Sequence, residues 1–238
     1  MARLTRHEIL KEDRFMMLVE ETRHFFTDNR SEILRALSAV GVVAVLVAGY
    51  YYYTAKQEGR SKEELAQALA TYHASVGNTE SSGSTAPVSF ETPTQKYEKA
   101  LSELQEVISR HNSRAAGKIA TYYSGLCLHR LDRSSEAVSL LEPLSQEQSD
   151  FGALALAALG RIYEDTADLA KATEVYQQLV ERNALTTPGE TLAMKVALLY
   201  ERQNQQEQAA EMYQRVIDDF PTSPASTEAE QRLRKIVP

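Results

Sequence analysis

The feature that most constrains this chain is an apolar run of 20 residues without a charge. The run extends from Ala36 to Ala55 and reads ALSAVGVVAVLVAGYYYYTA. At a rise of about 1.5 Å per residue, a helix of that length crosses a hydrocarbon core of about 30 Å. Arg35 and Lys56 flank the run, and four tyrosines end it, as suits headgroup interfaces. The run predicts one transmembrane helix over residues 35–56.

Two other interpretations of this run are a buried core helix and a cleaved signal sequence. A core helix is seldom apolar on every side over such a length, because one stripe usually faces solvent. The 35 residues that precede the run are too many for the basic n-region of a signal peptide. We therefore expect an uncleaved anchor that holds the rest of the chain at a lipid bilayer.

Charge is divided unevenly about the run. Residues 1–35 carry seven basic and seven acidic groups, whereas residues 57–238 carry 18 Lys and Arg against 26 Asp and Glu. An acidic domain without a basic stripe argues against a nucleic-acid partner. Basic residues counted over the whole tail favour a cytoplasmic N-terminus, although a count over about 20 residues on each side is a tie.

Helices are also expected on both sides of the anchor. Residues 1–34 predict an amphipathic helical tail, which either lies on the cytoplasmic interface or docks on a membrane partner. Residues 57–94 predict a helix followed by a flexible Ser-rich loop. In that helix, which we expect from Ser61 to Val76, Ser61 would be the N-cap and Glu64 would complete a capping box.

Residues 95–238 contain a repeated pattern. A small residue is followed by a bulky one three positions later, an alanine twelve positions later and a second bulky residue four positions after that. The copies are Gly125, Leu128, Ala137 and Leu141; Gly160, Tyr163, Ala172 and Tyr176; and Ala197, Tyr200, Ala209 and Tyr213. A half copy precedes them at Ala100 and Leu104, and Pro221 ends the last one, where a helix must stop.

The pattern resembles the tetratricopeptide repeat (TPR), a helix–turn–helix unit of about 34 residues. The small residues would let the two helices of a unit approach closely, and the tyrosines would fill the gap to the next unit. Unrelated amphipathic hairpins would not keep one register through three copies. The predicted fold is therefore all-α, a transmembrane helix followed by an α-solenoid of such hairpins that ends in a capping helix.

Catalytic chemistry is not indicated by any residue pattern. The single cysteine, Cys127, lies between leucines in a predicted helix, where a buried structural thiol is expected. The histidines are not at ligand spacing from one another or from this cysteine. Phosphate-binding loops and nucleophile elbows are also absent. We expect a protein that is not an enzyme and takes no cofactor, metal or small-molecule substrate.

Binding of protein partners is the function that remains. The first helices of stacked units line a concave face, which can hold a peptide or a helix. The residues expected to point there are Tyr122, Leu126, His129, Arg161, Glu164, Met194, Leu198 and Glu201. The alternative is a solvated face that binds nothing.

The segment LVEETRHFFTDNRSEILRALSAVGVVAVLVAGYYYYTAKQ, followed by a helix and repeats, resembles the YfgM-type bacterial membrane proteins. The resemblance implies an accessory of the Sec translocon that works with envelope chaperones. It also implies the bacterial inner membrane, with the repeats on the periplasmic side. The alternative is a structural subunit of another inner-membrane complex, held through the transmembrane helix and the N-terminal helix.

Overall fold

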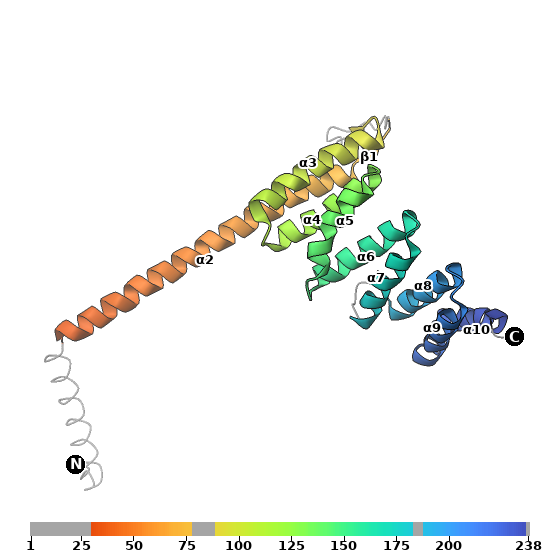
Figure 1. Cartoon of the computed structure of the whole chain (residues 1–238). Helices are drawn as coiled ribbons and strands as arrows, with labels where there is room; N and C mark the ends of the chain where they lie inside the picture. The colour runs from red at the N-terminus through yellow and green to blue at the C-terminus, as the bar shows by residue number, and fades with distance from the viewer. Residues whose placement is uncertain (1–29, 78–88, 183–187, 237–238) are drawn as a thin grey trace, which may run out of the picture. The chain divides into compact units, whose positions relative to one another are not determined.

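The computed structural model describes residues 30–77, 89–182 and 188–236 (Figure 1). Two compact units divide the chain, Met1–Gln57 and Glu58–Pro238. The predicted tail helix, up to residue 29, and most of the Ser-rich loop lie outside the described residues. Within them the predicted all-α fold is confirmed, apart from one small pair of strands.

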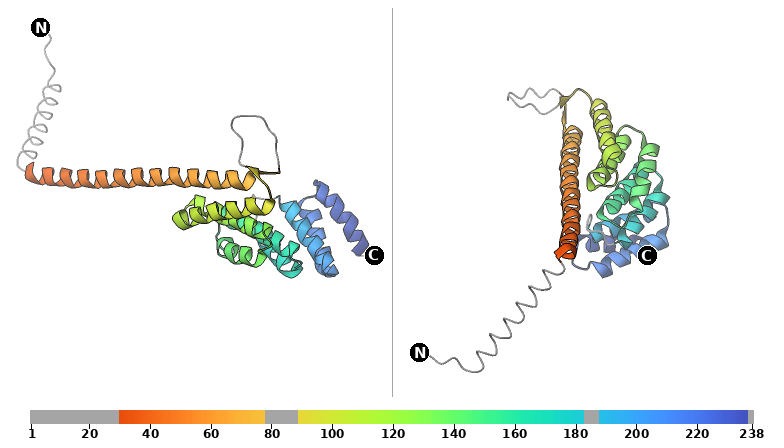
Figure 2. Two further views of the ribbon diagram at one scale, coloured as in Figure 1. Left: turned by 90° about the horizontal axis from the view of Figure 1, so that it is seen from above. Right: turned by 90° about the vertical axis from the view of Figure 1, so that its left-hand side faces the viewer.

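The elements follow one another with short connections. The helices are α2 (Arg30–His73), α3 (Pro93–His111), α4 (Ala115–Arg130), α5 (Ser134–Ser145), α6 (Asp150–Asp165), α7 (Leu169–Glu181), α8 (Gly189–Arg202), α9 (Gln206–Asp219) and α10 (Pro224–Ile236). The strands β1 (Ser75–Val76) and β2 (Ser89–Phe90) pair in parallel, with Ser75 opposite Ser89. Figure 2 shows α3 to α10 as successive hairpins.

The apolar run lies in the N-terminal part of α2. By length and composition, the segment Ser38–His73 is long and apolar enough to cross a membrane, and none of its most apolar stretch is buried. Val45 and Leu46, at the middle of the run, are 72% and 67% exposed. The first unit therefore presents a continuous apolar helix surface.

The helix start expected at Ser61 is not present, because α2 continues through this residue to His73. The Ser61 hydroxyl donates to the carbonyl of Glu58 at 2.9 Å, a bond inside the helix rather than an N-cap. Lys62 and Glu58 form an ion pair of 2.7 Å across one turn, which supports helix at this point. The helix ends three residues before the predicted Val76, which lies in β1 instead.

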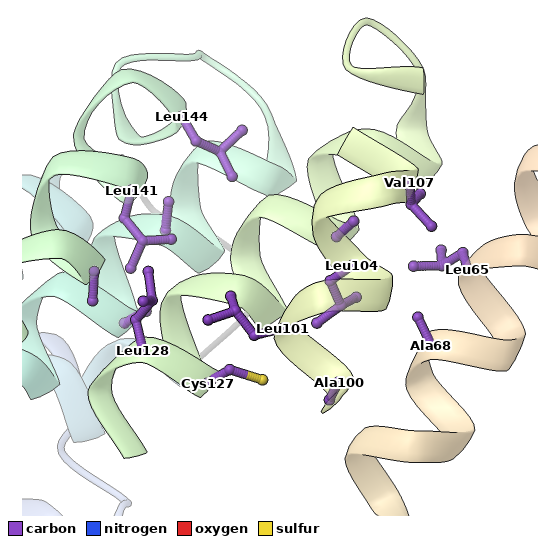
Figure 3. Packing of buried hydrophobic residues seen from close by; sticks show 14 of the residues in the cluster. Leu65, Ala68, Ala100, Leu101, Leu104, Val107, Cys127, Leu128, Leu141 and Leu144 are labelled. Atoms are coloured by element: carbon purple, nitrogen blue, oxygen red, sulfur yellow. The ribbon is translucent and has the colours of Figure 1, made fainter. Parts of the chain in front are cut away.

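The C-terminal part of α2 forms, together with α3, the first hairpin of the compact unit Glu58–Pro238. Leu65 and Ala68 of α2 are buried and face Leu104 and Val107 of α3 (Figure 3). The half copy of the repeat at Ala100 and Leu104 therefore lies on the second helix of this hairpin. Cys127 lies in the same core cluster, and burial raises the pKa of its thiol to about 12. The thiol is therefore uncharged at neutral pH.

The glycine of the repeat lies where the two helices of one repeat unit come into close contact. A Cβ atom at Gly125 would lie 2.6 Å from Cγ of Leu141, and one at Gly160 would lie 2.6 Å from Cζ of Tyr176. Because atoms do not approach so closely, a side chain there would force the helices apart. Tyr176 therefore packs inside its own unit, against Gly160.

The turns within the hairpins α4–α5, α6–α7 and α8–α9 share one geometry. In each turn a residue has a positive φ, and the next backbone N–H bonds to the carbonyl five residues earlier, a Schellman-type helix end. The residues are Asp132, Ala167 and Asn204, with φ of 59°, 62° and 57°. The bonds are Arg133 to Leu128, Asp168 to Tyr163 and Gln205 to Tyr200, at 2.9, 2.8 and 2.9 Å.

Replacing Ala167 with glycine is expected to raise the free energy of unfolding by about 1 kcal/mol, because the left-handed conformation strains a Cβ atom. Ala210, inside α9, provides the control, since Ala210→Gly is expected to lower it by about 1 kcal/mol. Urea unfolding of the full chain in detergent, followed by circular dichroism, measures both. Destabilisation by both variants would show that Ala167 is not strained.

Candidate protein-binding face

The residues predicted to line the concave face lie on the first helices of three units. The structure places Tyr122, Leu126 and His129 on α4, Arg161 and Glu164 on α6, and Met194, Leu198 and Glu201 on α8. Arg161 is exposed, and all the others except Met194 are half-buried. Met194 is 6% exposed in the core cluster of α6 to α10, so its side chain packs internally instead of facing a partner.

The C-terminal part of this face is hollowed. Glu164, Leu198 and Glu201 line a hollow of about 340 Å³, together with Lys195, Leu199, Arg202 and Arg232. The hollow has leucine side chains between groups of opposite charge. It therefore offers a small apolar contact and several charged hydrogen-bonding groups to a peptide.

Each carboxylate on this face is held by two partners. Glu164 accepts from the Tyr176 hydroxyl at 3.0 Å and from the Lys195 ammonium at 2.7 Å. The tyrosine belongs to the same unit and the lysine to the first helix of the next one. This three-residue group therefore joins two units, and it draws the carboxylate into an internal contact.

The same group recurs in the next unit. Glu201 accepts from the Tyr213 hydroxyl at 2.6 Å and from the guanidinium of Arg232 in α10 at 3.2 Å. Each member lies 37 residues after its counterpart in the preceding group. The sequence pattern predicts the acids and the tyrosines separately, but it does not predict Lys195 and Arg232. Their 37-residue spacing was the signal that could have found them.

These contacts set the protonation of the two tyrosines. Burial raises the pKa of Tyr176 and of Tyr213 above the ordinary value of 10.0, and the carboxylates of Glu164 and Glu201 raise it further. A phenol that must stay protonated in the fold stabilises it below pH 10 and loses this contribution as the pH rises further. The groups therefore predict alkaline destabilisation.

The variant Tyr176→Phe with Tyr213→Phe is expected to be less stable than the native chain at pH 8, because two hydrogen bonds to charged groups are lost. It is also expected to lose less stability between pH 8 and pH 11, because the two phenols no longer ionise on unfolding. Urea unfolding across this pH range measures both effects. An unchanged slope against pH would contradict the assignment to these tyrosines.

His129 also joins neighbouring units. One ring nitrogen, Nε2, lies 2.9 Å from the carboxylate of Asp165 in α6, and Nδ1 lies 3.0 Å from the Ser134 hydroxyl. The guanidinium of Arg161 lies 3.9 Å from the same carboxylate. Both ring nitrogens of His129 therefore have partners within the chain. The side chain of Arg161 is exposed and can contact a binding partner.

Tyr122 belongs to an aromatic cluster of residues from α2, α3 and α4. The ring centroids of Tyr72 and Tyr123 are 4.9 Å apart, those of Tyr122 and Tyr123 are 5.2 Å apart, and those of Tyr72 and Tyr97 are 5.8 Å apart. Such edge-to-face and tilted pairs are favourable ring arrangements. The Lys96 ammonium lies 4.6 Å from the Tyr97 centroid. Of these four tyrosines, only Tyr122 was predicted as a residue of the concave face.

Within residues 30–77, 89–182 and 188–236, no group of three or more His, Cys, Asp or Glu side chains could hold a metal ion. The polar contacts described above connect helices to each other. What the arrangement can do is bind a polypeptide, through aromatic rings and charged groups.

Comparison with known proteins supports a repeat scaffold. The family model "Psidin, N-terminal TPR repeats region" matches residues 91–223. A curated relative, the "N-terminal acetyltransferase B complex subunit NAA25 homolog" of Caenorhabditis elegans, is 24% identical over 138 residues. That match covers 58% of this chain but 14% of the relative's length.

Solved structures show the fold alone. Two crystal structures of nearly identical TPR-like repeats of a kinesin light chain protein from Podospora anserina are 14% identical to this chain. They superpose with TM-scores of 0.52 and 0.51 and cover 74% of this chain and 85% and 84% of their own. The predicted α-solenoid is thus confirmed.

Proposed function

Because the chain belongs to the family of the Psidin N-terminal TPR repeats region, we propose that it is a non-enzymatic adaptor, anchored in a membrane and binding proteins through its repeats. TPR arrays are scaffolds for protein–protein interactions, and the curated relative is a subunit of a complex. The observation that carries the membrane part is the exposed apolar run of α2, which directly precedes the repeat array.

The apolar run would be more stable in a bilayer than in water. The transfer of one exposed valine or leucine side chain from water to an apolar environment is favourable by about 1.5–3 kcal/mol. Val42, Val43, Val45, Leu46 and Val47 are each between 47% and 72% exposed. Residues 36–55 would therefore cross the membrane once, with the N-terminus in the cytoplasm and the repeats on the extracytoplasmic face.

The partner would be a component of the Sec translocon or an envelope chaperone at the bacterial inner membrane. The resemblance to the YfgM-type proteins supports this choice. The exposed Arg161 and the half-buried Leu126 and Leu198 supply contacts on the concave face. Because both the apolar and the charged contacts are few, we expect a modest and exchangeable interaction.

Protease treatment of spheroplasts tests the proposed topology. With the outer membrane removed, added protease is expected to degrade residues 57–238 and to leave the N-terminal tail protected. Lysed spheroplasts provide the control, since both parts are then accessible. Protection of the repeats in intact spheroplasts would place them in the cytoplasm and exclude envelope chaperones as partners.

The second candidate function is a structural subunit of another inner-membrane complex. The curated relative favours it, because that protein is itself named as a complex subunit. In this case residues 1–56 would make the fixed contacts. Replacing them with an unrelated anchor is expected to preserve partner binding if the repeats recruit the partner, and to abolish it if this segment does.

A further inference from the structure

A second groove lies on the side of α6 that is opposite the concave face. Helices α5, α6 and α7 enclose a hollow of about 500 Å³, here named the α5–α7 groove. Its accessible apolar lining comes from Pro143 of α5, Tyr163 of α6 and Val175 of α7, whereas Leu156 and Leu159 are buried in the core. The lining also includes Glu142 of α5 and Glu174 of α7.

Two carboxylates line the same hollow as the Tyr163 ring. Glu142 and Glu174 are exposed, and neither forms an ion pair with another described residue. Burial raises the pKa of Tyr163, the carboxylates of Glu142, Asp168 and Glu174 raise it further, and the Lys171 ammonium lowers it. The groove thus combines an aromatic ring, a small apolar lining and two carboxylates that form no ion pair with another described residue.

The chain itself already places one cation on this ring. The Lys171 ammonium lies 5.3 Å from the Tyr163 centroid and 3.2 Å from the carboxylate of Asp168. Lys171 is thus in an ion pair with Asp168, whereas Glu142 and Glu174 form no ion pair with another described residue. A cation near this ring is favoured electrostatically.

We propose that the α5–α7 groove is a second docking surface, which takes an arginine-bearing segment of a protein partner. The arginine stem would pack on Val175 and Pro143, and its guanidinium would lie near Tyr163, Glu142 and Glu174. Arginine fits better than lysine because its planar group stacks on rings and binds carboxylates through two hydrogen bonds. The net negative charge of residues 57–238 also attracts a basic segment.

The groove and the concave face use different sides of the same helix. Arg161 and Glu164 lie on the concave side of α6, whereas Leu159 and Tyr163 lie on the other. The two surfaces can therefore be occupied at the same time. This docking surface does not depend on the membrane anchor or on the identity of the concave-face partner.

Fluorescence anisotropy with the full chain in detergent tests the proposal. The probe is a labelled peptide, acetyl-Leu-Arg-Ala-Leu-Arg-Ala-amide, and its counterpart has citrulline, which is uncharged, in place of arginine. The arginine peptide is expected to bind about 10-fold more tightly, because only it forms charge-assisted bonds. The variant Glu142→Gln with Glu174→Gln is expected to remove that advantage.

A matched variant on another helix is the control. Glu207→Gln with Glu211→Gln removes the same charge from exposed positions of α9 and is expected to change affinity by less than about 2-fold. Circular dichroism verifies that all variants are folded. Equal affinity for the two peptides, equal weakening by both double variants, or no binding at about 1 mM peptide would overturn the proposal.

Discussion

Two arginines in the middle of the apolar run, Val43→Arg with Val47→Arg, are expected to release the chain from the membrane. Each arginine at the centre of a transmembrane helix costs about 2.5–3.5 kcal/mol in insertion, so the pair costs about 6 kcal/mol, a factor of about 10⁴. Both valines are exposed in the structure, so the change leaves the repeats intact. The measurement is the fraction of protein that remains in membranes after an alkaline carbonate wash.

The matched control places two arginines just outside the run, as Gln57→Arg with Gly59→Arg. This variant is expected to stay in the membrane, because arginine side chains near a helix end reach the interface. If the variant with arginines inside the run also stays in the membrane, residues 36–55 do not cross the bilayer. The anchor would then be a surface contact or would lie elsewhere.

Replacing Gly160 with leucine is expected to lower the free energy of unfolding by about 3 kcal/mol, because overpacking in a close helix contact forces backbone shifts. Tyr176 cannot move aside easily, since it is 4% exposed and its hydroxyl is bonded to Glu164. Urea unfolding measures the loss. The expected loss tests whether the small residue of the repeat is required by packing.

Two further variants identify the cause of this loss. Gly59→Leu changes a helical glycine that has no neighbour within 4 Å, so it is expected to stabilise α2 by less than about 1 kcal/mol. Gly160→Leu with Tyr176→Ala is expected to lose less than the sum of the single losses, because the leucine fills space that the ring vacates. Strict additivity would mean that Gly160 and Tyr176 do not compete for space.

The repeat could be predicted from the sequence because close packing of the two helices requires particular residue types at a regular spacing. A contact that admits no side chain selects a small residue at Gly125 and Gly160, and helix geometry sets the distance to the residue that packs against it. The apolar run is visible because it carries no charge over 20 positions, as the proposed crossing of a bilayer requires. Both signals come from one kind of residue at regular spacing.

Other features were missed because the same residue types suit several structures. Serine is a residue type that is common at N-caps. The hydroxyl of Ser61, however, donates to the backbone carbonyl of Glu58 inside a continuous helix. Ala167 is not a typical turn residue, although its positive φ is the same as that of Asn204 in the next unit. Lys195 bonds to an acid 31 positions earlier, so the pair becomes evident only when the units are stacked.

The most direct test of an anchored adaptor is purification of the tagged full-length chain in mild detergent, with co-purifying proteins identified by mass spectrometry. Translocon components or envelope chaperones are expected, and they should still be recovered when residues 1–56 are replaced by an unrelated anchor. Recovery of one different membrane complex in fixed stoichiometry, lost on that replacement, would contradict the adaptor function. The chain would then be a dedicated subunit held through its N-terminal segment.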